Sequence, residues 1–105
     1  MTDFVLILTT FPDDQRAETT ARTLVEERLA ACVNLHGPML SIYQWKGSVQ
    51  RDVERQVVIK TMRWRVPAVE ARVRALHSYE LPEFLVLPIE GGGDAYLAWI
   101  KEAVD

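Results

Sequence analysis

The sequence predicts an α+β fold in which helices cover one face of an antiparallel sheet. Short apolar runs typical of strands alternate with segments whose apolar residues recur every three or four positions, as in amphipathic helices. The turn signal Lys46-Gly47-Ser48 divides a long extended stretch into a hairpin. The resulting order is strand, helix, two strands, helix, strand and helix, and two such strand-helix-strand units favour layered packing. We therefore predict a ferredoxin-like βαββαβ antiparallel sheet with a long central hairpin and an added C-terminal helix.

The first half of the chain is predicted to hold a strand, a helix and the hairpin. Phe4–Thr10 is apolar and β-branched and is closed by Pro12, so we expect a strand buried on both faces. From about residue 13 to 29, apolar residues repeat at helical spacing opposite charged ones, which predicts an amphipathic helix. Extended chain follows over residues 31–62, and a break at Gly37-Pro38 indicates a bulge or kink within the first arm.

The second half is predicted to hold two helices separated by one strand. Pro67 suits the first turn of a helix, where its missing N–H costs nothing, and this helix is expected to end near His77. Phe84–Ile89 predicts a strand, and its Pro88 favours a sheet edge or a strand end. Three glycines then precede Asp94, a good N-cap for a last short helix.

Length and charge restrict the class of protein. A chain of 105 residues has room for one domain, which we assign to residues 1–105. A net charge of -3 offers no broad basic surface for a nucleic-acid backbone, so nucleic acid is not an expected partner. The apolar runs are far shorter than the ~20 residues that cross a bilayer, so no membrane span is expected.

Cysteine usage and the amino-terminal residues predict a cytoplasmic location. Cys32 is the one cysteine, which excludes an intrachain disulfide and fits a reducing compartment. No basic cluster precedes the first apolar run and no small-residue cleavage pattern follows it, so a signal peptide is not expected.

Several short motifs occur in an order and at separations that resemble a known family. They are Leu29–Asn34, Ser41–Gly47, Lys60-Thr61, His77–Glu83 and Asp94–Trp99. Together they closely resemble the CutA divalent-cation-tolerance family over nearly the whole chain. The resemblance implies a ferredoxin-like subunit that forms a homotrimer, similar in plan to the PII signalling proteins, with a link to tolerance of copper and other divalent metals. Ser78 departs from the family's usual proline, which relaxes the backbone restriction on His77.

Cys32, His77 and Glu80 are the candidate metal ligands. Thiolate suits Cu(I) and Zn and imidazole suits Cu(II) and Zn, so we predict a divalent metal ion as cofactor, with copper first. Cys32 has an alternative interpretation as a small apolar residue of a strand. His77 and Glu80 have one as a helix-capping histidine and a solvated carboxylate, since a firm site needs three or four ligands.

Tyr43, Trp45, Lys60 and Tyr79 are the candidate residues of a ligand cleft. Aromatic faces with one cation suit a small anionic or planar ligand. Tyr43 and Trp45 share one face of a strand, so their alternative role is packing against a neighbouring element.

The sequence lacks the motifs of common catalytic sites, and we predict a binding protein and not an enzyme. There is no phosphate-binding Gly-Lys-Thr loop, no dinucleotide-binding glycine fingerprint and no nucleophile beside an oriented base. An acylphosphatase-like hydrolase shares this fold and size, but the acidic, glycine-free segment Thr10–Asp14 would repel phosphate. The closer alternative is a PII-like sensor that binds a small molecule between subunits.

The long hairpin predicts an oligomer. Its arms exceed the ~5–6 residues of an average strand, and exposed strand edges need partners. Leu40, Ile42, Val57 and Ile59 are expected to add an apolar patch that soluble monomers rarely tolerate. Closed symmetry covers every edge, and the family resemblance sets the number of subunits at three.

Overall fold

The computed structural model describes residues 3–105, and its elements follow the predicted order. Met1 and Thr2, which belong to the segment considered for a signal peptide, lie outside the described residues. The elements are β1 (Phe4–Pro12), α1 (Arg16–Glu26), β2 (Cys32–Leu35), β3 (Met39–Trp45), β4 (Ser48–Met62), the 3-10 turn η1 (Arg63–Arg65), α2 (Val66–Leu76), β5 (Leu85–Pro88) and α3 (Asp94–Ala103).

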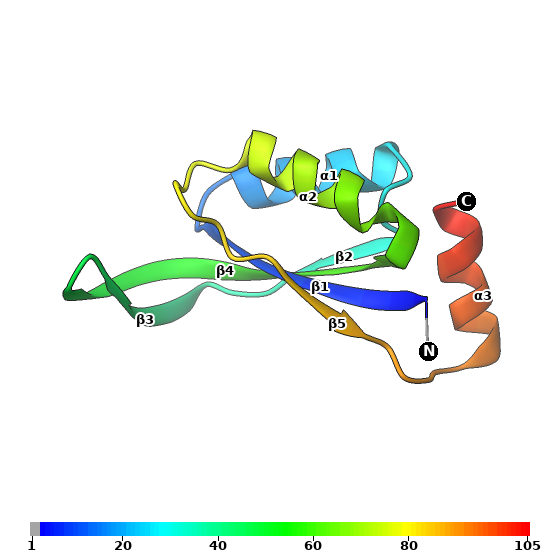
Figure 1. The fold of residues 1–105 in the computed structure, drawn as a ribbon. Helices are drawn as coiled ribbons and strands as arrows, with labels where there is room; N and C mark the ends of the chain where they lie inside the picture. Colours follow the sequence, from blue (N-terminus) through cyan, green and yellow to red (C-terminus); the bar gives the residue numbers. More distant parts are fainter. Residues whose placement is uncertain (1–2) are drawn as a thin grey trace.

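The strands of the described region form one antiparallel sheet, which confirms the predicted α+β class. Its order is β2-β4-β1-β5, and β3 pairs with β4 beyond the end of β2. Helices α1 and α2 lie over one face, while α3 lies beside the end of the sheet where β1 begins (Figure 1). The hairpin formed by β3 and β4 extends away from both helices (Figure 1).

Strand β4 links the hairpin to the rest of the sheet. Residues 54–62 pair with β1, whereas residues 48–54 pair with β3. The two arms are joined by Lys46 and Gly47, whose φ angles are 50° and 84°. Two positive φ values in succession define the hairpin turn whose twist matches that of its strands. The turn signal read from the sequence is therefore confirmed.

The core lies between the helices and one face of the sheet. Alternate residues of β1 point into it, namely Val5, Ile7, Thr9 and Phe11. On the other face of β1, Phe4, Leu6 and Leu8 are only half-buried, because α1 and α2 lie on the opposite face and α3 packs against the end at Phe4. The prediction that β1 is buried on both faces was wrong for this reason.

The break at Gly37 divides the first arm into β2 and β3. Gly37 has a φ of +123°, which side-chain-bearing residues rarely adopt. A Cβ at this position would also lie 3.1 Å from the Cα of Arg55 on β4. Both constraints require glycine, and they explain why the predicted single arm is two strands.

Three helix boundaries differ from the sequence prediction, and the first is the start of α1, which is Arg16 and not about residue 13. Helix α1 ends at Glu26 and not near residue 29, because Arg28 has a φ of 60° and turns the chain out of the helix. Leu29 is nevertheless buried in the core. Gly93 is the N-cap of α3, so Asp94 is its first helical residue and favours the helix through its charge near the N-terminus.

The exposed apolar surface of the hairpin differs from the one expected. Val57 and Ile59 are fully buried, since the helices cover this part of β4. Leu40 and Ile42 are exposed as predicted, and together with the exposed Val49 and Val53 they are called here the hairpin patch. Edge strand β5 also exposes Leu85, Val86 and Leu87. No helix within residues 3–105 is long and apolar enough to cross a membrane.

Candidate functional site

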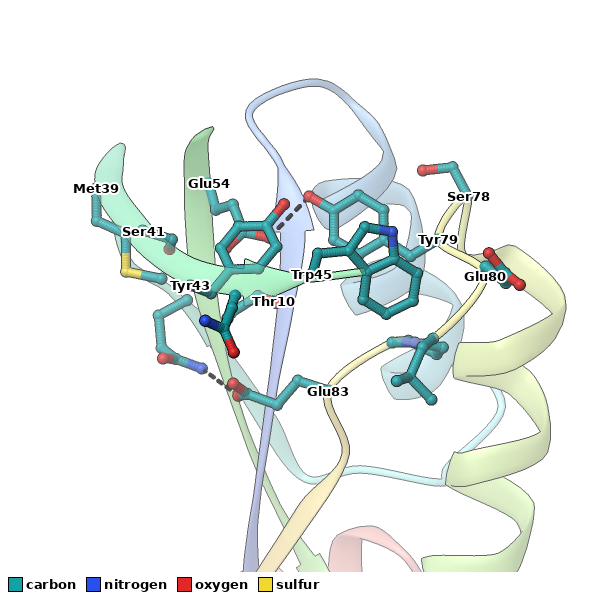
Figure 2. A pocket seen from close by; sticks show the side chains of 14 residues that line it. Thr10, Met39, Ser41, Tyr43, Trp45, Glu54, Ser78, Tyr79, Glu80 and Glu83 are labelled. Carbon is teal, nitrogen blue, oxygen red and sulfur yellow. Dashed lines mark hydrogen bonds between the residues drawn. The ribbon is translucent and has the colours of Figure 1, made fainter. Parts of the chain in front are cut away.

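An open cavity of about 830 Å³ lies between the hairpin and the segment 78–83 that follows α2 (Figure 2). We call it the hairpin cleft. Its lining residues come from β1, β3, β4 and that segment: Thr10, Met39, Ser41, Tyr43, Gln44, Trp45, Glu54, Gln56, Ser78, Tyr79, Glu80, Leu81, Pro82 and Glu83. The cleft therefore joins parts of the chain that are far apart in sequence.

The alternation of side chains along a strand determines which hairpin residues line the cleft. Ser41, Tyr43 and Trp45 are two residues apart and so share a face of β3. Leu40 and Ile42 of the hairpin patch point to the opposite face. Most of the β3 residues that line the cleft thus share one face, Gln44 being the exception, and the other face presents the apolar side chains of the hairpin patch.

His77 fastens the segment 78–83 to the sheet. Its Nε2 donates to the backbone oxygen of Thr10 at 2.6 Å, and its Nδ1 accepts the N–H of Tyr79 at 3.1 Å. Its ring stacks on Phe11 with centroids 4.1 Å apart. Burial lowers the pKa of His77, although the hydrogen bond to Thr10 and the charge of Glu54 oppose that shift. The neutral imidazole, protonated at Nε2, satisfies both hydrogen bonds.

The backbone of His77 keeps an extended conformation although Ser78 replaces proline. Its φ and ψ are -86° and 148°, within the region that a following proline would impose. His77 is the C-cap of α2, so its backbone leaves the helix at this point. The imidazole of His77 contacts β1 while the backbone of His77 keeps the extended conformation that a following proline would impose.

Two tyrosine hydroxyls in the cleft donate to carboxylates. The hydroxyl of Tyr79 donates to Oε2 of Glu54 at 2.7 Å (Figure 2), and Glu54 is only 7% exposed. Burial and this hydrogen bond raise the pKa of Tyr79 well above its ordinary value. The hydroxyl of Tyr43 donates to Asp52, and that bond is the main cause that raises the pKa of Tyr43.

Glu83 has a neutral partner. Nε2 of Gln56 donates to Oε2 of Glu83 at 3.2 Å and to the backbone oxygen of Thr9 at 2.7 Å. These bonds hold the end of the segment 78–83 beside β1 and β4. They orient the carboxylate of Glu83 without neutralising its charge.

The predicted cleft residues are only partly brought together. Tyr43, Trp45 and Tyr79 all line the hairpin cleft. Lys60 does not, because it lies farther along β4, where its Nζ is 3.4 Å from the hydroxyl of Tyr96 on α3. The cation expected to attract an anionic ligand is therefore outside the cleft.

The structure does not bring the predicted metal ligands together. Cys32 is half-buried at the start of β2, opposite Lys60, and its Sγ is 3.9 Å from Oδ1 of Asn34. His77 uses both ring nitrogens inside the chain. Glu80 is exposed, 3.7 Å from Nζ of Lys46. Across residues 3–105, no group of three or more His, Cys, Asp or Glu side chains is placed to hold a metal ion.

Comparison with known proteins identifies the family. A family model described as CutA1 divalent ion tolerance protein matches residues 5–103. The chain belongs to this CutA1 family. The divalent-cation tolerance protein CutA of Thermus thermophilus is 45% identical over 97 residues, which span 92% of this chain and 94% of that protein. Human protein CutA is 44% identical over 96 residues, which span 91% of this chain but 54% of the human protein.

A solved CutA structure has the same fold over the whole length. The crystal structure of CutA from Xylella fastidiosa matches with a TM-score of 0.95 and 41% identity, covering 99% of this chain and 100% of that one. The family resemblance inferred from the sequence motifs is thus confirmed.

Sequence reasoning missed several residues that line the cleft of this CutA-family chain. Glu54, Gln56 and Glu83 are polar lining residues that were not predicted, and only Glu83 belongs to a motif recognised in the sequence. One signal was present in the sequence. Glu54 and Gln56 lie two apart directly before the buried stretch of β4, so they had to share a sheet face.

Proposed function

We propose that this CutA-family chain is a trimeric divalent-cation-tolerance protein that acts by binding a divalent metal ion, with copper first, and not by catalysis. Its membership of the family over residues 5–103 supports the link to divalent cations. The observation that carries the metal proposal is the position of Cys32. This soft ligand is half-buried on β2, at an edge of the sheet, where a second subunit has access.

The metal site of this proposal includes ligands from more than one subunit. A firm site needs three or four ligands, and no such group occurs within residues 3–105 of one subunit. His77 would have to give up a hydrogen bond to Thr10 or Tyr79 before it could bind a metal ion. Cys32 is therefore the stronger of the predicted ligands.

A copper titration followed by calorimetry tests the metal proposal. Cys32→Ala and His77→Ala should each reduce copper binding if both residues serve one site, and the double variant should add little. Cys32→Ser is the matched variant, since it keeps the size of the side chain and removes the soft ligand. Full retention of stoichiometric copper binding in Cys32→Ala and Cys32→Ser would contradict the proposal.

The trimer is supported by two exposed apolar surfaces. The hairpin patch and the edge strand β5 both expose large apolar side chains, and soluble monomers rarely leave such surface uncovered. We propose that they are buried between copies of the chain, three in number by resemblance to the family. Closed symmetry would cover both surfaces on every subunit.

Sedimentation equilibrium at micromolar concentration tests the assembly. The wild-type protein should have the mass of three subunits, and Val53→Asp should lower that mass because it charges the hairpin patch. Val25→Asp is the matched control, since Val25 is an exposed valine of α1, away from the hairpin. A wild-type mass of one or two subunits that persists on dilution would show the trimer to be wrong.

A second candidate function is that of a PII-like sensor for a small molecule. The hairpin cleft favours it, because an open cavity with aromatic walls and a few oriented polar groups is the usual form of a ligand site. Separate calorimetric titrations of the purified protein with copper and with small molecules, both nucleotides and amines, would distinguish the two candidate functions.

We also propose a cytoplasmic location. The free thiol of Cys32 suits a reducing compartment. Cell fractionation followed by immunodetection tests this location, and recovery of the protein outside the cytoplasmic fraction would contradict it.

A further inference from the structure

We propose that the hairpin cleft binds a small organic cation, an alkylammonium or guanidinium group carried on an apolar body. This inference deepens the second candidate function and rests on it, because it names the class of ligand that the cleft would take. It does not depend on metal binding at Cys32.

The charge of the cleft selects a cation. Three of its lining residues are glutamates, Glu54, Glu80 and Glu83, and none of the lining residues is Lys, Arg or His. Glu54 is almost fully buried, and it accepts a hydrogen bond from the neutral hydroxyl of Tyr79. Glu83 likewise accepts from the neutral amide of Gln56. These bonds orient two carboxylates but leave their charges for a ligand to balance.

The spacing of the acidic side chains favours an organic cation over a metal ion. No three carboxylates, cysteines or histidines in residues 3–105 come close enough together to hold a metal ion. The cleft, with a volume of about 830 Å³, is far larger than an ion needs. Leu81, Pro82 and Met39 add apolar lining for the body of an organic ligand.

Aromatic rings supply the second half of the recognition. Tyr43, Trp45 and Tyr79 project into the same space between the hairpin and the segment 78–83 (Figure 2). The face of an aromatic ring attracts ammonium and guanidinium groups, most strongly for tryptophan. Rings combined with carboxylates are the chemistry by which proteins hold organic cations.

The chain's own Lys46 shows that an ammonium group is accepted at this place. Its Nζ lies 5.4 Å from the centre of the Trp45 ring and 3.7 Å from Oε2 of Glu80. Lys46 belongs to the hairpin turn at the mouth of the cleft and is not one of its lining residues. Its ammonium group therefore occupies one ring and one carboxylate that a free cation would use, and it acts as an internal competitor.

Nuclear magnetic resonance of the indole N–H groups tests the proposal in the intact, metal-free protein. The probe is 1-butylamine, with 1-butanol as the neutral analogue and butanoate as the anion. Butylamine should shift the Trp45 indole signal saturably, while Trp64 and Trp99, which lie outside the cleft, serve as internal references. Butanol should bind more weakly and butanoate should leave the Trp45 signal unchanged.

Two substitutions assign the binding to the carboxylates of the cleft. Glu83→Gln should weaken butylamine about tenfold, because it removes a charge-assisted hydrogen bond. Glu70→Gln should not, since Glu70 is a partly exposed glutamate of α2 that pairs with Arg74. No saturable shift of Trp45 with butylamine, or an equal shift with butanoate, would overturn the proposal. So would an unchanged affinity in Glu83→Gln.

Lys46→Met separates this proposal from a general electrostatic attraction. Removing the competing ammonium group should strengthen butylamine binding severalfold, with the shift still confined to Trp45. An affinity unchanged or reduced in Lys46→Met would contradict the role given to Lys46. The outcome is independent of the copper titration of the Cys32 variants, so failure of one proposal leaves the other open to its own test.

Discussion

The two halves of β4 belong to one continuous strand, yet they differ sharply in burial. In residues 54–62 the side chains of Val57, Ile59 and Thr61 are fully buried. In residues 48–53 the side chains of Val49 and Val53 are 71% and 52% exposed. Both halves are paired strand, with β1 and β2 beside the inner half and β3 beside the outer half.

This difference shows that hydrogen bonding to neighbouring strands defines β4, whereas cover by α1 and α2 decides which of its side chains are buried. Val53 and Val57 are the same residue type on the same face of one strand. Val57 lies in the part of the sheet that α1 and α2 cover, whereas Val53 lies on the hairpin beyond them (Figure 1). The inner half of β4 therefore contributes to the core, and its outer half presents its side chains at the surface.

The largest effect is expected when a valine is shortened in the inner half of β4 and, for comparison, in the outer half. Val57→Ala should lower the free energy of unfolding by about 2–3 kcal/mol, because it leaves a cavity in a packed core. Val53→Ala removes the same methyl groups from a side chain that is half-exposed in one subunit, and it should cost less, about 1 kcal/mol, part of it through weaker contacts with other copies. Urea denaturation at a fixed subunit concentration measures both. Equal costs would mean that the outer half is as well packed as the inner half.

A smaller difference is expected between the two tyrosine–carboxylate bonds. Tyr79→Phe should cost about 1–2 kcal/mol, because the nearly buried Glu54 loses the hydrogen bond that satisfies its charge. Tyr43→Phe should cause no measurable loss, since Asp52 on the outer half of β4 is exposed and water replaces the hydroxyl. Unfolding in urea compares the two variants, and a larger cost for Tyr43→Phe would reverse the assignment.

The smallest effect concerns pH and the segment 78–83. Burial lowers the pKa of His77 in the folded state, so the unfolded chain binds a proton more readily. The resulting stability is complete above the ordinary histidine value of about 6.5 and is lost as the pH falls through the folded pKa. Unfolding measured between about pH 7.5 and 5 should show this loss.

A matched pair of histidine variants assigns the pH effect. His77→Gln should remove part of the slope below about pH 6.5, because the titrating ring is gone. His36→Gln removes an exposed imidazole beside Gly37, and a slope that survives in it assigns the effect to His77. The same slope in wild type and in His77→Gln would contradict the assignment.

Local patterns were enough to predict the elements and their order. The turn at Lys46-Gly47, the proline in the first turn of α2 and the edge position of Pro88 all follow from residue-specific backbone rules. The extent of helix cover is not a local property. For this reason β1 was expected to be buried on both faces, and Val57 and Ile59 were expected in an exposed patch.

The candidate site was predictable where it depended on strand alternation. Tyr43 and Trp45 share a face of β3, and Tyr79 belongs to the recognised motif after α2, so these three were found. The placement of Lys60 beside Tyr96 depends on how α3 returns to the sheet, which no local pattern encodes. The contacts of Glu54 and Glu83 depend in the same way on how the segment 78–83 crosses β1 and β4.

The continuity of β4 also has a mechanical consequence. The inner half of β4 is held between β1 and β2, whereas the outer half pairs with β3 and extends beyond α1 and α2. Glu54 lies at the boundary between the two halves, where the pairing with β1 ends and the pairing with β3 begins. A force applied to the hairpin turn would bend β4 most strongly at Glu54. A partner that displaced the turn would therefore first change the position of Glu54, which lines the hairpin cleft.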